Sequence, residues 1–214
     1  MGRRRERYQW TGSGIVFEDT KSIPPHADYK ELDKTRAAFM KQFNATLEEL
    51  RAGNLNRRRA GIILRGMLNT YGNRAFRDGL EYGGVDADDA DSNDERTIQR
   101  LLAEQSPYVS KFTNEIVNGD GITDPQAKQK AIMWFNKSID PFYQAGLMSA
   151  DANGMYTWRL GNTDHCSTCS SMAGQRHRLK YYLNSGIYPR SPRLECGGFN
   201  CQCSLLKDDS LRNR

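Results

Sequence analysis

Apolar residues recur at helical spacing through most of the first 150 residues. In the stretch 28–53 they follow steps of seven, four, four and three, which predicts an amphipathic helix that Asp28 caps and Gly53 ends. A second helix is expected from about residues 54–56 to Gly83, where a pair of glycines ends it. The apolar stripes of these two helices are Leu32, Phe39, Phe43, Leu47 and Leu50, and then Ile63, Met67, Tyr71, Ala75 and Leu80.

An acidic stretch at residues 86–95 separates these helices from two more. It lacks the glycine and the closing glutamate of an EF-hand loop, so we interpret it as a turn whose carboxylates favour the N-terminus of the next helix. That third helix is expected at 92–117, with a kink at Pro107, and a fourth begins at Asp124, a capping residue. The positions that we expect to be packed are Leu32, Phe39, Phe43, Ile98, Phe112 and Ile132.

The pattern changes near residue 154. Residues 155–160 alternate with period two and are rich in strand formers, 178–184 fit one short helix, and 202–206 fit a closing strand. We therefore predict a mainly α protein, with an elongated helical N-terminal domain followed by a small α+β cysteine-rich module of the zinc type. The expected segments are an extended arm at 1–27, the helical domain at 28–153, the metal-binding module at 154–206 and a charged tail at 207–214.

The composition favours an elongated or partner-dependent protein. Hydrophobic residues make up 37% of the chain and the mean hydropathy is −0.77, which argues against one large core. No run approaches the ~20 apolar residues of a membrane helix, and the basic N-terminus has no apolar stretch after it. We therefore expect neither a membrane segment nor a secretory signal. Without a route to an oxidising compartment, the cysteine thiols should stay reduced.

All five cysteines lie in the last fifty residues. Cys166 and Cys169 have the C-x2-C spacing that turns two thiolates toward one metal ion, and an odd number of reduced cysteines favours metal ligation over disulfides. For the second pair we favour Cys196 and Cys201, because the two glycines that follow Cys196 supply a flexible turn. Cys201 with Cys203 is the alternative, although residues two apart on a strand point to opposite faces.

The expected zinc site is structural rather than catalytic. Four protein ligands close the metal shell and leave no place for water. His165 and His177 are further candidate ligands. The chain has no H-E-x-x-H, P-loop or G-x-S-x-G motif, and a metal-bound thiolate is a poor free nucleophile. We therefore do not expect an enzyme.

Two groups of arginines are candidate contacts to nucleic acid or to a partner protein. They are Arg3, Arg4 and Arg5 on the arm, and Arg57, Arg58 and Arg59 at the start of the second helix. Positive charge in a first helical turn opposes the helix dipole, so the second group suits a phosphate or an acidic surface; a solvated basic face is the alternative. The net charge of +5 is compatible with non-specific contact with DNA.

Residues 155–206 resemble a known family. A strand with Y-T-W at 156–158 precedes a turn with H-C-S-T-C at 165–169, and the run L-E-C-G-G-F-N-C-Q-C-S-L at 194–205 closes the module. In this order the motifs resemble the C-terminal module of tailed-phage minor head proteins, the Mu F-like head morphogenesis family. The helical part is similar in style but much less distinctive.

The resemblance implies a structural minor head protein of a bacteriophage virion. It would lie in the phage head near the portal, and in the host cytoplasm during assembly. Its partners would be the portal protein and other head proteins, and it would assist head assembly, DNA packaging or delivery. The alternative is a zinc-ribbon-like nucleic-acid-binding protein acting outside a particle. The contacts expected on that alternative are Arg176, Arg178, Lys180, Tyr181, Tyr182 and Arg190.

Overall fold

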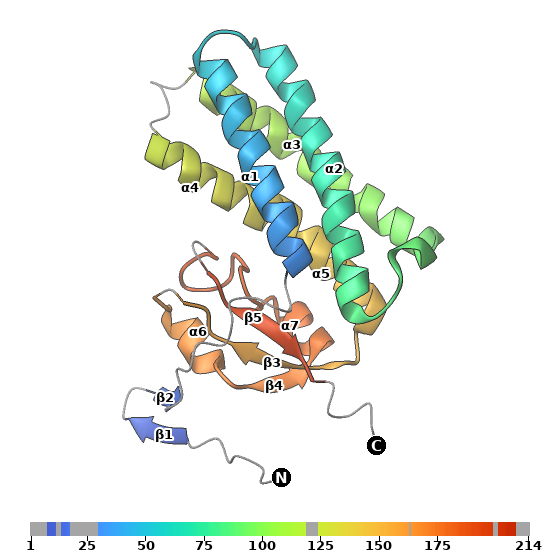
Figure 1. The fold of residues 1–214 in the computed structure, drawn as a ribbon, viewed down its shortest axis with the longest axis vertical. Helices are drawn as coiled ribbons and strands as arrows, with labels where there is room; N and C mark the ends of the chain where they lie inside the picture. Colours follow the sequence, from blue (N-terminus) through green and yellow to red (C-terminus); the bar gives the residue numbers. More distant parts are fainter. Residues whose placement is uncertain are drawn as a thin grey trace. The chain divides into compact units, whose positions relative to one another are not determined.

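The computed structural model describes residues 8–11, 14–17, 30–118, 124–162, 164–198 and 201–208. The protein is mainly helical, which confirms the predicted fold class (Figure 1). It divides into two compact units: the helical unit, Lys30–Ala152, and the cysteine unit, Asn153–Arg214 together with Met1–Tyr29. Among the described residues, no helix has the length and apolar character needed to cross a membrane.

The helical unit begins with long helices close to the predicted ones. They are α1 (Lys30–Arg51), α2 (Arg57–Gly83) and α3 (Ser92–Asn118), with a 3-10 turn η2 (Ala87–Asp89) before α3. The side chain of Asn56 accepts from the backbone N–H of Arg59 to start α2, and Gly84 ends it in the left-handed conformation (φ 96°). At the start of α3, Asp91 accepts hydrogen bonds from the backbone N–H groups of Asn93 and Asp94. The acidic turn therefore caps a helix, as we interpreted it.

The predicted fourth helix consists of three segments. They are α4 (Asp124–Trp134), the π-helical turn η3 (Phe135–Ile139) and α5 (Asp140–Asp151). Pro141 lies in the first turn of α5 and has no N–H with which to continue the α-helical ladder. The π turn precedes this proline, and at its end the backbone N–H of Asp140 donates to the carbonyl oxygen of Phe135, five residues earlier.

Aromatic rings form the core of the helical unit. The ring of Phe39 packs against Phe43, Tyr71 and Trp134 with centroid distances of 5.7, 5.5 and 5.7 Å. This joins α1, α2 and α4 around one centre. Of the six positions expected to be packed, five are buried, and Ile132 is partly exposed because Ala131 takes the inward position beside it. Aromatic residues thus supply a larger core than the low hydrophobic content led us to expect.

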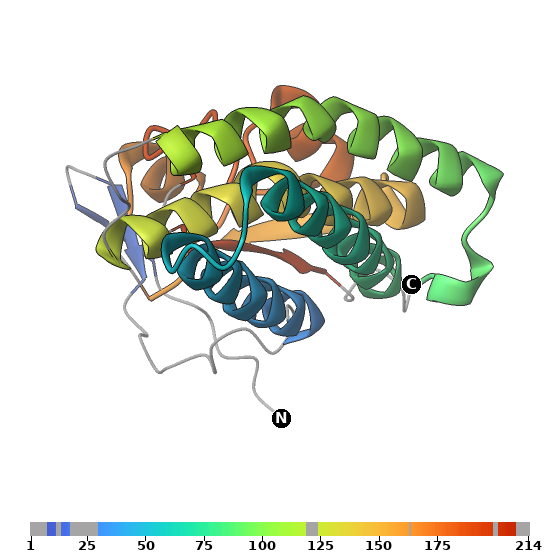
Figure 2. The same ribbon diagram turned by 90° about the horizontal axis from the view of Figure 1, so that it is seen from above.

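Helix α2 is the centre of this unit, since it contacts α1, α3 and α5 (Figure 2). Its crossing with α5 depends on glycine. A Cβ atom at Gly79 would collide with the carbonyl oxygen of Tyr143 and lie 2.8 Å from the backbone nitrogen of Leu147. On the other helix, a Cβ atom at Gly146 would collide with the carbonyl oxygen of Phe76. The two backbones can touch only because neither glycine has a side chain.

The cysteine unit contains a three-stranded antiparallel sheet in the order β4-β3-β5. Its elements are β3 (Met155–Arg159), α6 (Ser167–Met172), β4 (Arg176–Arg178), α7 (Leu179–Ser185) and β5 (Ser204–Lys207). Tyr156 and Trp158 on β3 are fully buried while their neighbours are partly exposed, which confirms the predicted alternation. Helix α7 and strand β5 lie close to the predicted helix and closing strand, whereas α6 and β4 were not predicted.

Part of the expected N-terminal arm forms an antiparallel hairpin. Strand β1 (Tyr8–Thr11) pairs with β2 (Gly14–Phe17), with Tyr8 opposite Phe17. The rest of the arm, with Arg3, Arg4 and Arg5, lies outside the described residues, as do residues 209–214 of the expected charged tail.

We expect Gly79→Ala to lower the free energy of unfolding of the protein by about 2–3 kcal/mol, because the backbone of α5 cannot move aside for a methyl group. Gly66→Ala on the same helix is the matched control. A Cβ atom at Gly66 meets nothing within 4 Å, so this change should raise the free energy of unfolding by about 0.5–1 kcal/mol through helix propensity. Urea unfolding followed by circular dichroism measures both, and equal effects would contradict the proposed crossing.

Candidate metal centre

The five cysteines come from two segments of the cysteine unit. Cys166 is the residue before α6, in extended conformation, and Cys169 lies in the first turn of that helix. Cys196 lies in a turn after α7, and Cys201 and Cys203 lie in the irregular segment that leads into β5. Strand β5 pairs with β3, and this pairing anchors the end of that second segment in the sheet.

The sulfur atoms form two overlapping groups. The Sγ atoms of Cys166, Cys169 and Cys196 all lie within 4.8 Å of one another, and so do those of Cys169, Cys201 and Cys203. The Sγ atoms of Cys169 and Cys201 are 3.9 Å apart. All five thiols are free, and Cys169 belongs to both groups. These five residues, which we call the cysteine cluster, could hold a metal ion.

Our argument against pairing Cys201 with Cys203 was wrong. It assumed that both residues lie on a strand and therefore point to opposite faces, but β5 begins only at Ser204. In the irregular backbone before the strand, both sulfur atoms turn toward Cys169. Both pairs that we considered for the second half of the site therefore contribute to the cluster.

The two candidate histidines differ in position. The Nδ1 atom of His165 lies 3.9 Å from the Sγ atom of Cys203, at the margin of the cluster. His177 lies on β4, where its ring stacks on Tyr181 with a centroid distance of 4.0 Å and its Nε2 atom pairs with Gln175 Oε1 at 3.1 Å. His177 is therefore engaged elsewhere, and only His165 is close to the sulfur atoms.

Crowding decides which of these thiols can ionise. Hydrogen bonds from Cys169 and Cys203 lower the pKa of Cys201 to about 2, and the hydrogen bond with Cys201 raises the pKa of Cys169. The Cys169 side chain lowers the pKa of Cys203, but the Cys201 side chain and burial outweigh it and raise this pKa to about 11. Two thiolates 4 Å apart repel by about 4 kcal/mol at an effective dielectric constant of 20. The cluster can therefore hold one thiolate without a cation, but several thiolates at this spacing need a cation to offset their repulsion.

Backbone amides point at the sulfur atoms. Burial opposes ionisation of Cys166, but the N–H groups of Cys169 and Cys196 donate to its sulfur, and its pKa is lowered on balance. The N–H group of Gly198 donates to Cys196, although burial raises the pKa of that thiol. Backbone N–H groups that donate to cysteine sulfur atoms stabilise the thiolate form, and they fix the orientation of the sulfur atoms toward a metal ion.

The turns that present these amides need unusual backbone conformations. Gly197 and Gly198 have positive φ angles of 61° and 76°, which explains why the sequence places two glycines there. Arg190 also has a positive φ, 68°, and its backbone N–H donates to Cys201. A Cβ atom at Gly198 would collide with the carbonyl oxygen of Arg190, so these two turns are in direct contact.

Glu195 joins the two cysteine segments. Its carboxylate accepts hydrogen bonds from the hydroxyl group and from the backbone N–H of Ser167, the latter at 2.9 Å, and these bonds lower the pKa of Glu195. The contact holds the turn that carries Cys196 against the start of α6. Sequence analysis missed the roles of Glu195 and Arg190. The only signal for Glu195 was its place next to Cys196.

Arg57, Arg58 and Arg59 lie in the first turn of α2, as predicted, and all three are exposed. They belong to the helical unit and are not part of the cysteine cluster. Arg57 and Arg58 line a cavity, whereas Arg59 does not. These arginines are therefore a second candidate site with its own chemistry.

The fold and the cluster define a class: a mainly helical protein with a C-terminal group of cysteines suited to a metal ion. Comparison with protein-family models, with curated proteins and with solved structures found no match to this chain. The residues of the two candidate sites and their geometry are therefore the basis for inferring a function.

We expect Cys169→Ser to weaken metal binding by more than roughly 100-fold, because both sulfur groups lose the residue that they share. Loss of a residue that only hydrogen-bonds to a ligand typically weakens metal affinity by about 10–100-fold. Ser170→Ala on the same helix is the control and should leave binding unchanged. The measurement is titration with cobalt(II), whose sulfur charge-transfer absorption reports thiolate ligation, on protein kept reduced. Unchanged absorption in Cys169→Ser would contradict a shared role for this residue.

Proposed function

We propose that this protein is a structural minor head protein of a tailed phage, docking on the portal or the inner head and assisting head assembly, DNA packaging or delivery. The observation that carries the proposal is the order of motifs at 156–158, 165–169 and 194–205, which resembles that family's C-terminal module. The compact arrangement of the same motifs supports it. They form one unit, which contains the buried strand β3, the turn before α6 and the turn with Gly197 and Gly198.

The proposed metal is a structural zinc ion. A donor set made of thiols suits zinc, whose tetrahedral Zn–S distance of about 2.3 Å separates neighbouring sulfur atoms by about 3.8 Å. The 3.9 Å between Cys169 and Cys201 fits this spacing. We propose Cys166 and Cys169 as two ligands, with two more from Cys196, Cys201 and Cys203. Four such ligands leave no position for water, which supports a non-enzymatic role.

The second candidate function is nucleic-acid binding by the cysteine unit outside a particle. It is favoured by Tyr181, which is 50% exposed and stacks on His177; the exposed residues Arg178 and Lys180 lie between these two positions in the sequence. However, Tyr182 is buried, and burial raises its pKa to about 12. Arg190 is only 4% exposed, and Arg176 forms an ion pair with Asp208 at 2.7 Å. Half of the expected contact set is thus engaged within the unit, so we prefer the first candidate.

The proposal predicts that the protein is present at low copy number in purified phage particles, which mass spectrometry of gradient-purified heads measures with the portal protein as the reference. It should also co-purify with the portal in roughly 0.5 M salt, because apolar contacts persist when exposed charges are screened. A protein present in infected cells but absent from particles would contradict the proposal. Tight, sequence-selective DNA binding that persists at high salt would favour the second candidate instead.

A further inference from the structure

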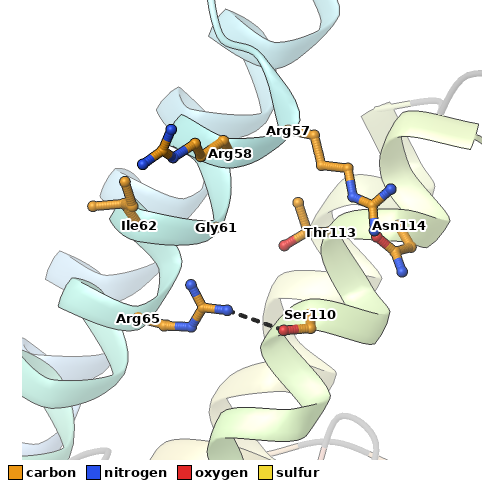
Figure 3. A pocket seen from close by; sticks show the side chains of 8 residues that line it. All are labelled: Arg57, Arg58, Gly61, Ile62, Arg65, Ser110, Thr113 and Asn114. Carbon is orange, nitrogen blue, oxygen red and sulfur yellow. Dashed lines mark hydrogen bonds between the residues drawn. The ribbon is translucent and has the colours of Figure 1, made fainter.

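A cavity of about 420 Å³ lies between the start of α2 and the second half of α3, both in the helical unit. Its volume is within the roughly 300–1,000 Å³ of small-ligand sites and exceeds the space that one phosphate group fills. We call it the arginine pocket. Figure 3 shows its lining residues, which are Arg57, Arg58, Gly61, Ile62, Arg65, Ser110, Thr113 and Asn114.

The charge of the arginine pocket has one sign. Three of the lining residues are arginines and none is acidic. Among the described residues, neither Arg57 nor Arg58 takes part in an ion pair. The first turn of α2 has no acidic residue either, so the positive end of the helix dipole adds to the same potential. An anion is the ligand that this pocket favours.

Helix α3 supplies neutral hydrogen-bonding groups opposite these arginines. Arg65 donates to the hydroxyl group of Ser110 at 3.0 Å, which directs its guanidinium across the space between the helices (Figure 3). Arg57 extends toward Asn114 in the same view. The Oδ1 atom of Asn114 is buried and has no hydrogen-bond partner, which is uncommon in native proteins. The amide of Asn114 also carries an Nδ2 group, and only that group could donate to an anion, so binding of an anion would require the amide to turn over.

We propose that the arginine pocket binds phosphate groups, from a free polyphosphate or from the backbone of a nucleic acid. A carboxylate has two oxygens, which pair with the two N–H groups of one guanidinium. The three arginines of the pocket present more N–H donors than one carboxylate can accept from. A tetrahedral phosphate carries more oxygens and more charge, and the volume accommodates more than one. The exposed side chain of Ile62, 59% accessible at the rim, offers an apolar surface to the group that carries the phosphate. This inference does not depend on the proposed role in a phage head.

The chain offers a matched pair of charge variants. Arg57→Ala and Arg59→Ala remove the same charge from the same helical turn, but only Arg57 lines the pocket. The probes are tripolyphosphate, by isothermal titration calorimetry, and a fluorescein-labelled DNA duplex, by anisotropy at low salt. Arg57→Ala should weaken tripolyphosphate binding by about tenfold or more, as expected for a lost charged hydrogen bond, and Arg59→Ala by less than about twofold.

A second pair leaves the charge unchanged. A Cβ atom at Gly61 would lie 3.8 Å from an Arg65 guanidinium nitrogen and 3.9 Å from the Thr113 hydroxyl, so a side chain fits there but occupies the pocket. Gly61→Val should therefore weaken binding by about tenfold or more through lost space and displaced donors. Gly66→Val makes the same change where nothing lies within 4 Å, and it should leave binding intact. Thermal unfolding of each variant shows whether it remains folded; if Gly61→Val does not, the arginine pair decides.

The outcomes separate the two sources of phosphate. If tripolyphosphate and DNA compete with each other, and Arg57→Ala weakens the binding of both, the pocket is a site for the nucleic-acid backbone. Tripolyphosphate binding without DNA binding supports the pocket as a site for free polyphosphate. Equal losses in Arg57→Ala and Arg59→Ala would overturn the proposal, because they would indicate diffuse surface charge. So would binding of neither probe, or stronger displacement by polyglutamate than by polyphosphate, which would indicate an acidic protein as the ligand.

Discussion

The cysteine unit depends on how five thiol groups share one small space. One of them, Cys201, ionises easily because its neighbours donate hydrogen bonds to it, and that same charge opposes ionisation of Cys169 and Cys203. The surrounding structure holds the sulfur atoms together despite this conflict. Positive φ angles at Gly197, Gly198 and Arg190 shape the turns whose backbone N–H groups point at the sulfur atoms. The hydrogen bond from Ser167 to Glu195 holds the two cysteine segments together. A cation resolves the conflict, which is why the arrangement suits a metal ion.

The helical unit depends on two different uses of glycine along α2. Near its C-terminal end, Gly79 lets the backbone of α2 touch α5. Near its N-terminal end, Gly61 faces α3 and leaves space between the two helices. A Cβ atom placed at Gly61 would have no backbone atom of a neighbouring element within 4 Å. The close contact fixes the position of the helix, and the open contact leaves the arginine pocket between fixed walls. A ligand there meets donors that are already in place, which lowers the cost of ordering them.

Sequence reasoning predicted what depends on local signals. The approximate bounds of α1, α2 and α3 followed from apolar periodicity and from breaks such as the glycine pair at the end of α2. It failed where the outcome depends on neighbours distant in sequence. We predicted one helix from Asp124 with Pro141 near its end, whereas a π turn precedes Pro141 and α5 continues after it. We also predicted that β5 begins two residues earlier than it does, which led to the wrong argument that Cys201 and Cys203 point to opposite faces. The arginine pocket could not be predicted, because it needs α2 and α3 to be packed side by side.

Both candidate sites are departures from local charge and hydrogen-bond balance. Some partly buried polar groups of the helical unit are paired between elements, as in the 2.6 Å hydrogen bond from Thr35 to Asp78. The same holds for the bond from Ser149 to Asp94. The cysteine cluster instead gathers five thiols that can become thiolates, and the arginine pocket gathers three guanidinium groups with no carboxylate in its lining. Leaving like groups together costs stability, so each arrangement persists because the surrounding backbone enforces it. The ligand that restores balance is a cation in the first case and an anion in the second.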